Sequence, residues 1–589
     1  MRVVVAALLC TLPLRAQTAS SPAETFADEV VRAGWSGNAM ANGVSATVRR
    51  IRLFSKGMVQ ATRGSEALTE EQRAALEDVM RVTFTEAGWY LDAAVEPGTY
   101  RIGIEASGSD FQFVMRDPDG SRIADSAYWV GSTSNELAAV GVTSGQGFMK
   151  TNLRVGDSTI SWRFVSQSAL RSAVGDVTTV EAGPIRILTD IKALDGVRAL
   201  AEECRKAIRV HARVLQASPP KGPYEIYLLH TKGRFEKVGN LLNDGQFNDR
   251  RGFHLGLTGH GFVDCYHVWH AGCDKRLPLQ LRSTTIHELH HMVADRAYPS
   301  MSSRWPVWLK EGLAEAGTLK ALGKKDREHE RARIDAYWLE SQRRGTAPRP
   351  EDLFGDSTGD PVDAFYAAAL YLVEEMLRRP KKVKALLRLL TDHLHEPTSR
   401  VLARAWFERE YGPAVEVLRK VTNRKASNVP LLRNGFIEIE KETWSVLTGR
   451  NRAAFAILPP VKEEAPDQTL RTAFQWDTAG QSQADLYLAY ARGQRAEQFL
   501  KIAVGPRYIM LFWNRYGSWT TVGRVNYDKD LPLGGWHDVE ATTDGDSVSV
   551  TVGPRTETFE LPYTVPLRGT RAGVGAYGSL VRFRNPQVK

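Results

Sequence analysis

The spacing of apolar residues changes along the chain and divides it into three regions. In residues 48–170 and 445–589, short runs alternate apolar and polar residues between turn-forming glycine, proline and aspartate, which predicts strands. In residues 178–425, longer runs repeat apolar residues every three or four positions, which predicts helices. We therefore expect a multidomain α+β chain whose central region is mainly helical.

The central region is expected to start with a small sheet. The runs PIRILTD at 184–190 and YEIYLL at 224–229 have the length and composition of buried strands. Residues 195–215 between them have helical periodicity. Further along, residues 364–377 (AFYAAALYLVEEML) are expected to form a buried helix. A helix on a small sheet followed by many helices is one of the layered arrangements that can enclose a single core.

One helix of this region contains a candidate metal motif. His287, Glu288 and His291 follow the order H-E-x-x-H. Residues four apart share a helix face, so both imidazoles can reach one Zn²⁺ ion at about 2.0–2.1 Å. Glu288 lies about 100° further round the helix and can face a water molecule at the metal as general base. We expect this helix to be capped by a hydroxyl from residues 283–285 and to end at Tyr298, which precedes a proline.

A catalytic zinc site needs a third protein ligand. Glu311 is the candidate, because it lies twenty residues after His291 in a run, WLKEGLAEAG, that predicts a second helix joined to the first by a turn. Glu315 follows one helical turn later. We expect Glu315 to accept the free N–H of a ligating histidine, the bond that fixes the orientation of the ring. The alternative is a metal-free amphipathic helix with two stacked surface histidines.

The sequence HELHH followed by WLKEGLAE is similar to the gluzincin metallopeptidases, the superfamily of thermolysin and aminopeptidase N. Their pattern is HExxH and then a glutamate ligand on the next helix. The resemblance covers residues 178–425 and rests mainly on residues 281–317. It implies a thermolysin-like, mainly helical metallopeptidase domain with Glu288 as base and with the zinc ligands His287, His291 and Glu311. The G-x-M-E-N signature is absent, so aminopeptidase specificity is not implied.

The same resemblance implies two further roles. Gluzincins usually supply a tyrosine or histidine from the later helices to the oxyanion of the tetrahedral intermediate. Tyr366, at the start of the predicted buried helix, is the candidate, and core packing is the alternative. Gluzincins also bind the substrate backbone along an edge strand. Residues 252–263 contain four glycines that permit close approach and are the candidate for this strand, with a flexible loop as the alternative.

Composition and the first residues indicate where the protein acts. The sequence has 43% hydrophobic and 25% charged residues, the balance of a soluble globular protein. Residues 1–16 resemble a secretory signal peptide, and residues 17–47 are expected to form a loose leader. We therefore predict a secreted or periplasmic protein, and no later apolar run reaches the roughly 18 residues of a transmembrane helix. The net charge of +9 is spread over predicted helices without interleaved aromatic residues, so we expect no nucleic-acid partner.

The three cysteines after the signal peptide leave one question open. Cys265 and Cys273 are eight residues apart and can either pair in an oxidising compartment or stay reduced. Cys204 lies within a helical pattern, and we expect it to be a buried free thiol.

The flanking regions show strands and no catalytic motif. Residues 48–175 are expected to form an N-terminal β-rich accessory domain. Residues 445–589 predict a β-sandwich, because the ending GVGAYGSLVRFRNPQV is similar to the last strand of concanavalin A-like (laminin G-like) jelly rolls. Such domains often hold sugars on aromatic side chains. The candidates here, for which core packing is the alternative, are Trp476, Trp513, Tyr516, Trp519 and Trp536.

These observations predict a secreted zinc metallopeptidase that cleaves peptide or protein substrates. The alternative is a catalytically silent protein that binds a carbohydrate or a cell-surface ligand through its C-terminal sandwich.

Overall fold

A computed structural model of the chain describes residues 35–589 except for residues 42–43, 50, 54–68, 92, 108–109, 129–134, 145–147, 156–157, 232, 244–251, 256–257, 266–276, 299–304, 344, 356–361, 392–395, 423–430, 434–435, 441, 448–452, 459–466, 477–482, 493–496, 516–517, 562–570 and 579. It contains both helical and β-sandwich regions, so the multidomain α+β prediction is confirmed. The chain falls into two compact units. The first takes in residues up to 85 with 97–143 and 150–162, and the second takes in 86–96, 144–149 and 163–589.

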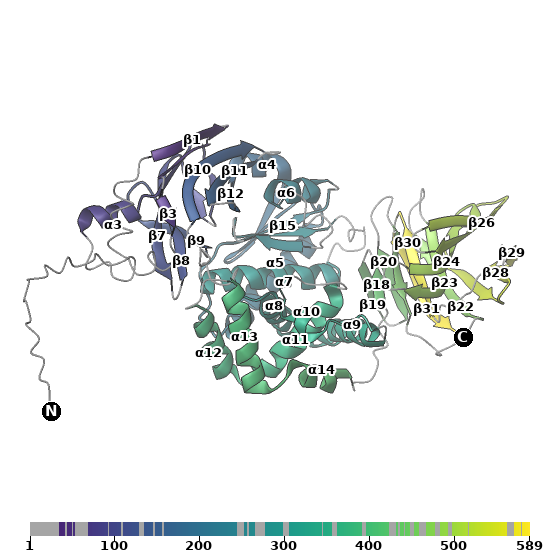
Figure 1. The fold of residues 1–589 in the computed structure, drawn as a ribbon. Helices are drawn as coiled ribbons and strands as arrows, with labels where there is room; N and C mark the ends of the chain where they lie inside the picture. The colour runs from purple at the N-terminus through teal and green to yellow at the C-terminus, as the bar shows by residue number, and fades with distance from the viewer. Residues whose placement is uncertain are drawn as a thin grey trace, which may run out of the picture. The chain divides into compact units, whose positions relative to one another are not determined.

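The N-terminal region contains two six-stranded sheets (Figure 1). In spatial order, the first consists of β1 (Trp35–Ala41), β2 (Val44–Arg49), β4 (Met80–Phe84), β7 (Gly98–Ser107), β8 (Asp110–Arg116) and β9 (Arg122–Tyr128). The second consists of β3 (Ile51–Leu53), β10 (Asn135–Ser144), β11 (Phe148–Val155), β12 (Ser158–Ser166), β5 (Gly88–Tyr90) and β6 (Ala93–Val95). Helix α3 (Glu70–Leu76) starts at Thr69, which forms a reciprocal capping box with Gln72.

Two strands lie where we expected a loose leader at residues 17–47. Strand β1 pairs with β2, and β2 pairs with β4. Val44, Ala46 and Val48 are all buried, which is the alternation of a strand with one face on a core. The prediction is therefore wrong from residue 35 onward, because the many small alanine, serine and glycine residues conceal this alternation. Residues 17–34 lie outside the described part.

The end of the N-terminal region also differs from the predicted boundary at residue 175. Residues 163–175 belong to the second unit. Helix α4 (Gln167–Val174) buries Leu170 and Val174 in one cluster with Phe235 of α6 (Arg234–Asn243). Periodicity could not assign this helix, because it does not identify the neighbour against which a face packs.

The central region begins with a five-stranded mixed sheet. In spatial order it consists of β13 (Thr178–Ala182), β14 (Ile185–Thr189), β15 (Tyr224–Leu229), β17 (His260–Asp264) and β16 (Gly252–Leu255). Strands β14, β15 and β17 are parallel, whereas β16 runs antiparallel to β17 at the edge. Helix α5 (Leu194–Val214) connects β14 to β15. The two predicted strands and the helix between them are thus confirmed, and residues 252–263 supply both the edge strand and its neighbour.

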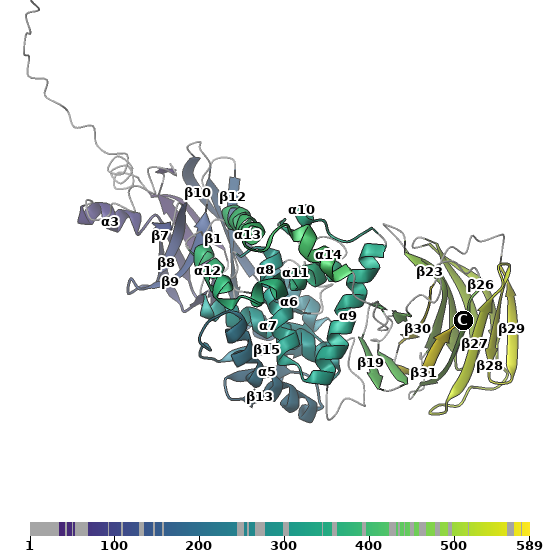
Figure 2. The same cartoon turned by 90° about the horizontal axis from the view of Figure 1, so that it is seen from below.

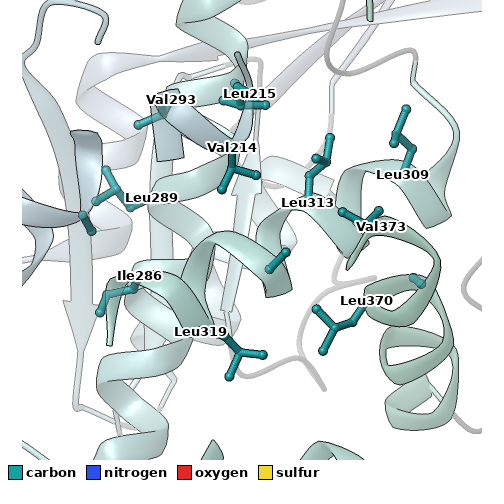
Figure 3. Packing of buried hydrophobic residues seen from close by; sticks show 14 of the residues in the cluster. Val214, Leu215, Ile286, Leu289, Val293, Leu309, Leu313, Leu319, Leu370 and Val373 are labelled. Carbon is teal, nitrogen blue, oxygen red and sulfur yellow. The ribbon is translucent and has the colours of Figure 1, made fainter. Parts of the chain in front are cut away.

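Eight helices follow within the described residues. They are α7 (Leu279–Ala297), α8 (Val307–Ala321), α9 (Lys324–Arg343), α10 (Pro350–Leu353), α11 (Val362–Leu377), α12 (Pro380–Thr391), α13 (Glu396–Tyr411) and α14 (Ala414–Thr422). One apolar core joins α5, α7, α8 and α11, and Figure 3 shows their side chains packed together. In the part of the chain that the structure describes, no helix has the length and apolar character needed to cross a membrane.

The C-terminal region is a sandwich of two seven-stranded sheets (Figure 2). One sheet consists of β18 (Leu431–Arg433), β21 (Ala453–Ile457), β30 (Arg571–Tyr577), β23 (Gln483–Arg492), β24 (Glu497–Gly505), β25 (Tyr508–Arg515) and β26 (Ser518–Asn526). The other consists of β19 (Phe436–Glu440), β20 (Thr443–Leu447), β31 (Leu580–Val588), β22 (Thr469–Trp476), β27 (His537–Thr543), β28 (Ser547–Val552) and β29 (Arg555–Glu560). The predicted β-sandwich is confirmed, but its strands start at Leu431 and not at 445. The first two strands are short and follow the last helix closely, so composition does not mark the boundary.

Candidate metal centre

Helix α7 brings the HExxH residues into the core, but it does not start where we expected. It begins at Leu279, with Pro278 before it, because Leu279 and Leu281 are buried and extend the apolar face. The hydroxyl of Ser283 donates to the Gln280 carbonyl oxygen at 3.1 Å, and that of Thr285 donates to the Leu281 carbonyl oxygen at 2.8 Å. These hydroxyls bond back into the helix, so the prediction that residues 283–285 cap it is wrong.

The end of α7 and the start of α8 set the direction of the third candidate ligand. Helix α7 ends at Ala297 with Tyr298 as its C-cap residue, as expected. Helix α8 then buries Trp308, Leu309 and Leu313, which turns Glu311 toward α7.

The structure places the three candidate ligands together. Nε2 of His287 lies 3.2 Å from Nε2 of His291 and 3.1 Å from Oε2 of Glu311. Nε2 of His291 lies 3.5 Å from the same Glu311 oxygen. The donor atoms of the three side chains all lie within 4.8 Å of one another. Among the described residues, no other set of three or more histidine, cysteine or acidic side chains meets this condition.

The donor set fits a zinc ion. A tetrahedral ion bonded at about 2.0–2.1 Å holds its donor atoms about 3.3 Å apart, close to the three distances found here. Two imidazole nitrogens and one carboxylate oxygen also match the ligands of hydrolytic zinc sites. Because these are three protein donors, such an ion would keep a position open to solvent or substrate. The group therefore suits a catalytic site better than a closed structural one.

A carboxylate oxygen faces each of the two ring nitrogens of His287. Its Nδ1 lies 3.3 Å from Oε1 of Glu315, opposite the side that faces Glu311. Burial alone lowers the pKa of His287, but the hydrogen bonds and charges of Glu311 and Glu315 raise it well above its ordinary value. Burial alone raises the pKa of Glu311, but the charges of His291 and His287 hold it well below its usual range. Glu315 thus occupies the place of the partner that orients a ligating histidine.

Glu288 lies against the edge of the five-stranded sheet. Its side chain is buried, and burial raises the pKa of its carboxyl, partly offset by the charges of His287 and His291. A Cβ atom on Gly252 would lie 3.1 Å from Oε1 of Glu288 and 2.9 Å from Cγ2 of Thr284. The absence of a side chain at Gly252 therefore lets strand β16 approach the candidate base closely.

Tyr366 lies beside His287. It belongs to the first turns of α11, and its ring centroid is 6.0 Å from that of His287, with 24° between the ring planes. The side chain is half-buried and packs against the main core. The structure therefore brings together all six residues that the sequence singled out for this centre, namely His287, Glu288, His291, Glu311, Glu315 and Tyr366.

Sequence reasoning missed a second layer of histidines around the centre. On one side, His254 of β16 places Nε2 at 2.5 Å from Oδ2 of Asp295. Burial lowers the pKa of His254, but Asp295 raises it above its ordinary value. On the other side, Nδ1 of His290 lies 3.0 Å from Nδ1 of His211 in α5, and burial lowers the pKa of both rings. No spacing in the sequence links these pairs, because each joins residues far apart in the chain.

Among the described residues, no cysteine belongs to the convergent group of donor atoms. Cys204 is buried and free, as expected, and burial raises the pKa of its thiol. Cys265 is also buried and free. Its suggested partner Cys273 lies outside the described residues, so their pairing stays a prediction.

The aromatic candidates of the sandwich separate into two classes. Trp476 is only 1% exposed and lies in the core, so it is not available to a ligand. Trp513 packs against the same core, and Trp536 lies under the Arg584 guanidinium at 4.1 Å. Tyr516 lies outside the described residues. In contrast, Trp519 of β26 is 54% exposed.

Two phenylalanine rings contact the exposed Trp519. The ring of Trp519 meets Phe499 edge-on with centroids 5.5 Å apart, and meets Phe512 at 6.2 Å. Phe499 is itself buried in a cluster with Tyr487 and with Tyr337 of α9. These two contacts restrict the rotation of the indole, while about half of its surface stays exposed.

Comparisons with known proteins concern fold alone. No protein-family model and no curated protein matches the chain. Solved structures with carbohydrate-binding or galectin-like β-sandwich folds match part of it. They include the carbohydrate-binding module CBM66 from Bacillus subtilis, at 11% identity and TM-score 0.23 over 28% of this chain and 97% of that chain. The carbohydrate recognition domain of Emp46p in its metal-free form matches at 11% identity and TM-score 0.23, over 28% of this chain and 89% of that chain. A Bacillus licheniformis β-glucanase matches at 9% identity and TM-score 0.22, over 28% of this chain and 92% of that chain.

Proposed function

We propose that this protein is a secreted zinc metallopeptidase of the gluzincin type. The observation that carries the proposal is the convergence of His287, His291 and Glu311 from two helices, with Glu288 beside them at the edge of a sheet. Glu315 supports the assignment because it faces the ring nitrogen of His287 that is turned away from the group. The substrate class is a peptide or protein that lies along strand β16.

Different residues of the chain have different roles in the proposed hydrolysis. A zinc ion bound by His287, His291 and Glu311 supplies Lewis acidity toward water and toward the peptide carbonyl. Glu288 takes a proton from the attacking water and then passes it to the leaving amine. Burial suits Glu288 to both steps, because a raised pKa makes its carboxylate a better proton acceptor while it can still release the proton. The hydroxyl of Tyr366 donates a hydrogen bond to the carbonyl oxygen of the substrate as negative charge develops on it during the attack.

Replacement of the base tests this function directly. In Glu288→Gln the amide keeps the shape of the side chain but cannot accept the proton, so hydrolysis of a peptide library should fall about 10²- to 10⁴-fold. Metal analysis should still find one zinc per chain, because Glu288 is not a ligand. His291→Ala is the matched variant that should lose the zinc as well as the activity. Full hydrolysis by Glu288→Gln, or no zinc in the wild-type protein, would refute the proposal.

A second function is proposed for the C-terminal sandwich, namely binding of a carbohydrate. Its support is the exposed indole of Trp519, whose position is fixed by T-shaped contacts with Phe499 and Phe512, since an exposed aromatic ring can stack on the apolar face of a pyranose ring. If the metal centre proves silent, this function would be the main activity of the protein.

A glycan array followed by titration of the best-bound glycan tests the second function. Trp519→Ala should weaken binding by at least about tenfold, which corresponds to about 1.4 kcal/mol. Leu533→Ala, which removes another exposed apolar side chain of the same region, should leave the affinity unchanged. Equal affinities in all three proteins would exclude Trp519 as the binding surface.

A further inference from the structure

Strand β16, next to the metal centre, is hydrogen-bonded to a neighbouring strand along one of its two edges. Within the described residues, β16 is the last strand and pairs with β17, so its other edge has no strand partner. Its distance from helix α7 therefore depends on what its side chains contact. Alternate residues of a strand point to the same face, so Gly252 and His254 both face α7.

His254 joins three elements through its ring. Its side chain is 6% exposed. Nε2 lies 2.5 Å from Oδ2 of Asp295 on α7, and Nδ1 lies 3.0 Å from the carbonyl oxygen of His260 on β17. An oxygen atom thus faces each ring nitrogen, and the imidazole cannot turn without breaking one of the two contacts.

These contacts hold the strand beside the candidate ligands. Asp295 lies four residues after His291, so both occupy one face of α7. The rings of His254 and His291 are nearly parallel, with centroids 6.4 Å apart and 11° between their planes. At the other end of the strand, Gly252 lies so close to Glu288 and Thr284 that a Cβ atom there would come within 3.1 Å of both side chains. Strand β16 is therefore fixed to α7 at two places, one beside the candidate base and one a helical turn beyond a candidate ligand.

We propose that His254 and Asp295 are positioning residues, which set the distance between the open edge of β16 and the metal centre and so align an extended peptide for cleavage. This inference rests on the proposed metallopeptidase function. A peptide that adds to β16 as a further strand takes its position from the main chain of β16. A displacement of about 1 Å at this strand moves the scissile carbonyl away from Glu288, and misplacement of that size can cost about 100-fold in rate.

Peptide binding in a Glu288→Gln background tests the role, because the inactive protein does not consume its ligand. The probes are the extended peptide that the wild-type protein cleaves fastest from a mixed library and a dipeptide cut from it, both carrying a fluorescent label. His254→Phe and Asp295→Asn should each weaken binding of the extended peptide about 10- to 100-fold. The dipeptide does not reach along the strand, so its affinity should change less than about twofold. Zinc content should stay at one per chain.

Controls separate the positioning role from a general loss of structure. His537→Phe makes the same replacement at a half-buried histidine of the sandwich and should change neither affinity. The double variant should bind the extended peptide no more weakly than the weaker single variant, because the two side chains act through one contact. If His254→Phe does not fold, Asp295→Asn carries the test, since it keeps the shape of the side chain.

Several outcomes would overturn the inference. Unchanged affinity for the extended peptide in both variants would show that the pair does not position the strand. Loss of zinc, or equal weakening of the extended peptide and the dipeptide, would assign the pair to the metal centre or to general stability. If the wild-type protein cleaves no peptide of the library, the proposed function fails and this inference fails with it.

Discussion

At the metal centre, the net pKa shift of each buried histidine depends on the side chains that face it. His287 faces two carboxylates, which outweigh burial and raise its pKa. His290 and His211 face each other, and burial lowers the pKa of both rings. The pair is therefore neutral, and one Nδ1–H can donate to the other Nδ1. A Cβ atom on Gly317 would lie 2.5 Å from Nδ1 of His211, so the pair occupies the space that this glycine leaves.

The neutral pair should make the metal-free protein sensitive to acid. Burial lowers the pKa of His211 from 6.5 to about 3 in the folded state. Between these values the unfolded chain binds the extra proton, so the free energy of unfolding falls as pH drops below 6.5, by up to about 1.4 kcal/mol per pH unit. In His211→Gln this contribution is absent. Urea unfolding of both proteins in EDTA at pH 7, 6 and 5 should show a stability difference that shrinks as the pH falls. A constant difference would show that His211 titrates normally.

At the scale of secondary-structure elements, the centre depends on how closely α8 and α11 approach. Glu311 lies on α8 and Tyr366 lies on α11, so the spacing of these helices sets where both side chains reach. Gly312 of α8 lies where this helix packs against α11. A Cβ atom at this position would lie 2.5 Å from the Ala369 carbonyl oxygen and 2.6 Å from Cγ2 of Val373. Both helices are buried there, so no flexible group can move aside.

Substitution of that glycine should separate the helices. Gly312→Ala should destabilise the protein by about 1–3 kcal/mol despite the better helix propensity of alanine, because overpacking displaces backbone. Zinc affinity should fall in the same variant, since Glu311 is the neighbouring residue. Gly323→Ala is the control, because a Cβ atom there meets nothing within 4 Å. Thermal unfolding and chelator competition measure the two effects, and a Gly312→Ala protein as stable as Gly323→Ala would contradict the packing argument.

At the scale of the whole molecule, the two proposed functions belong to different folds. Peptide hydrolysis is assigned to residues of α7, α8 and α11, whereas carbohydrate binding is assigned to β26 of the sandwich. Each proposed site is assigned to its own set of elements, and no residue is assigned to both. Trp519→Ala should therefore leave hydrolysis of a soluble peptide unchanged, and Glu288→Gln should leave glycan affinity unchanged. Assays of both activities on both variants check this independence, and a change in the second activity would show that the sites are coupled.

Local patterns in the sequence identified most elements and the candidate residues that the structure brings together at the centre. The four-residue spacing of His287 and His291 places two imidazoles on one helix face in any setting, because helix geometry depends on neighbouring residues alone. The strands of the sandwich could be predicted for the same reason, since alternation is local. Predictions failed where the local signal was weak, as in β1 and β2, whose small side chains hide the alternation, and at residues 283–285, whose hydroxyls bond within α7 and not at its end.

Only the tertiary structure decided which distant residues meet. The distance from Glu311 to the two imidazoles follows from the core that packs α7 against α8, not from the intervening sequence alone. The pairs His254–Asp295 and His211–His290 each join elements whose separation along the chain carries no periodic signal. The exposure of Trp519 and the burial of Trp476 were open for the same reason, because identical side chains on alternating strands become core or surface only when the two sheets close on each other.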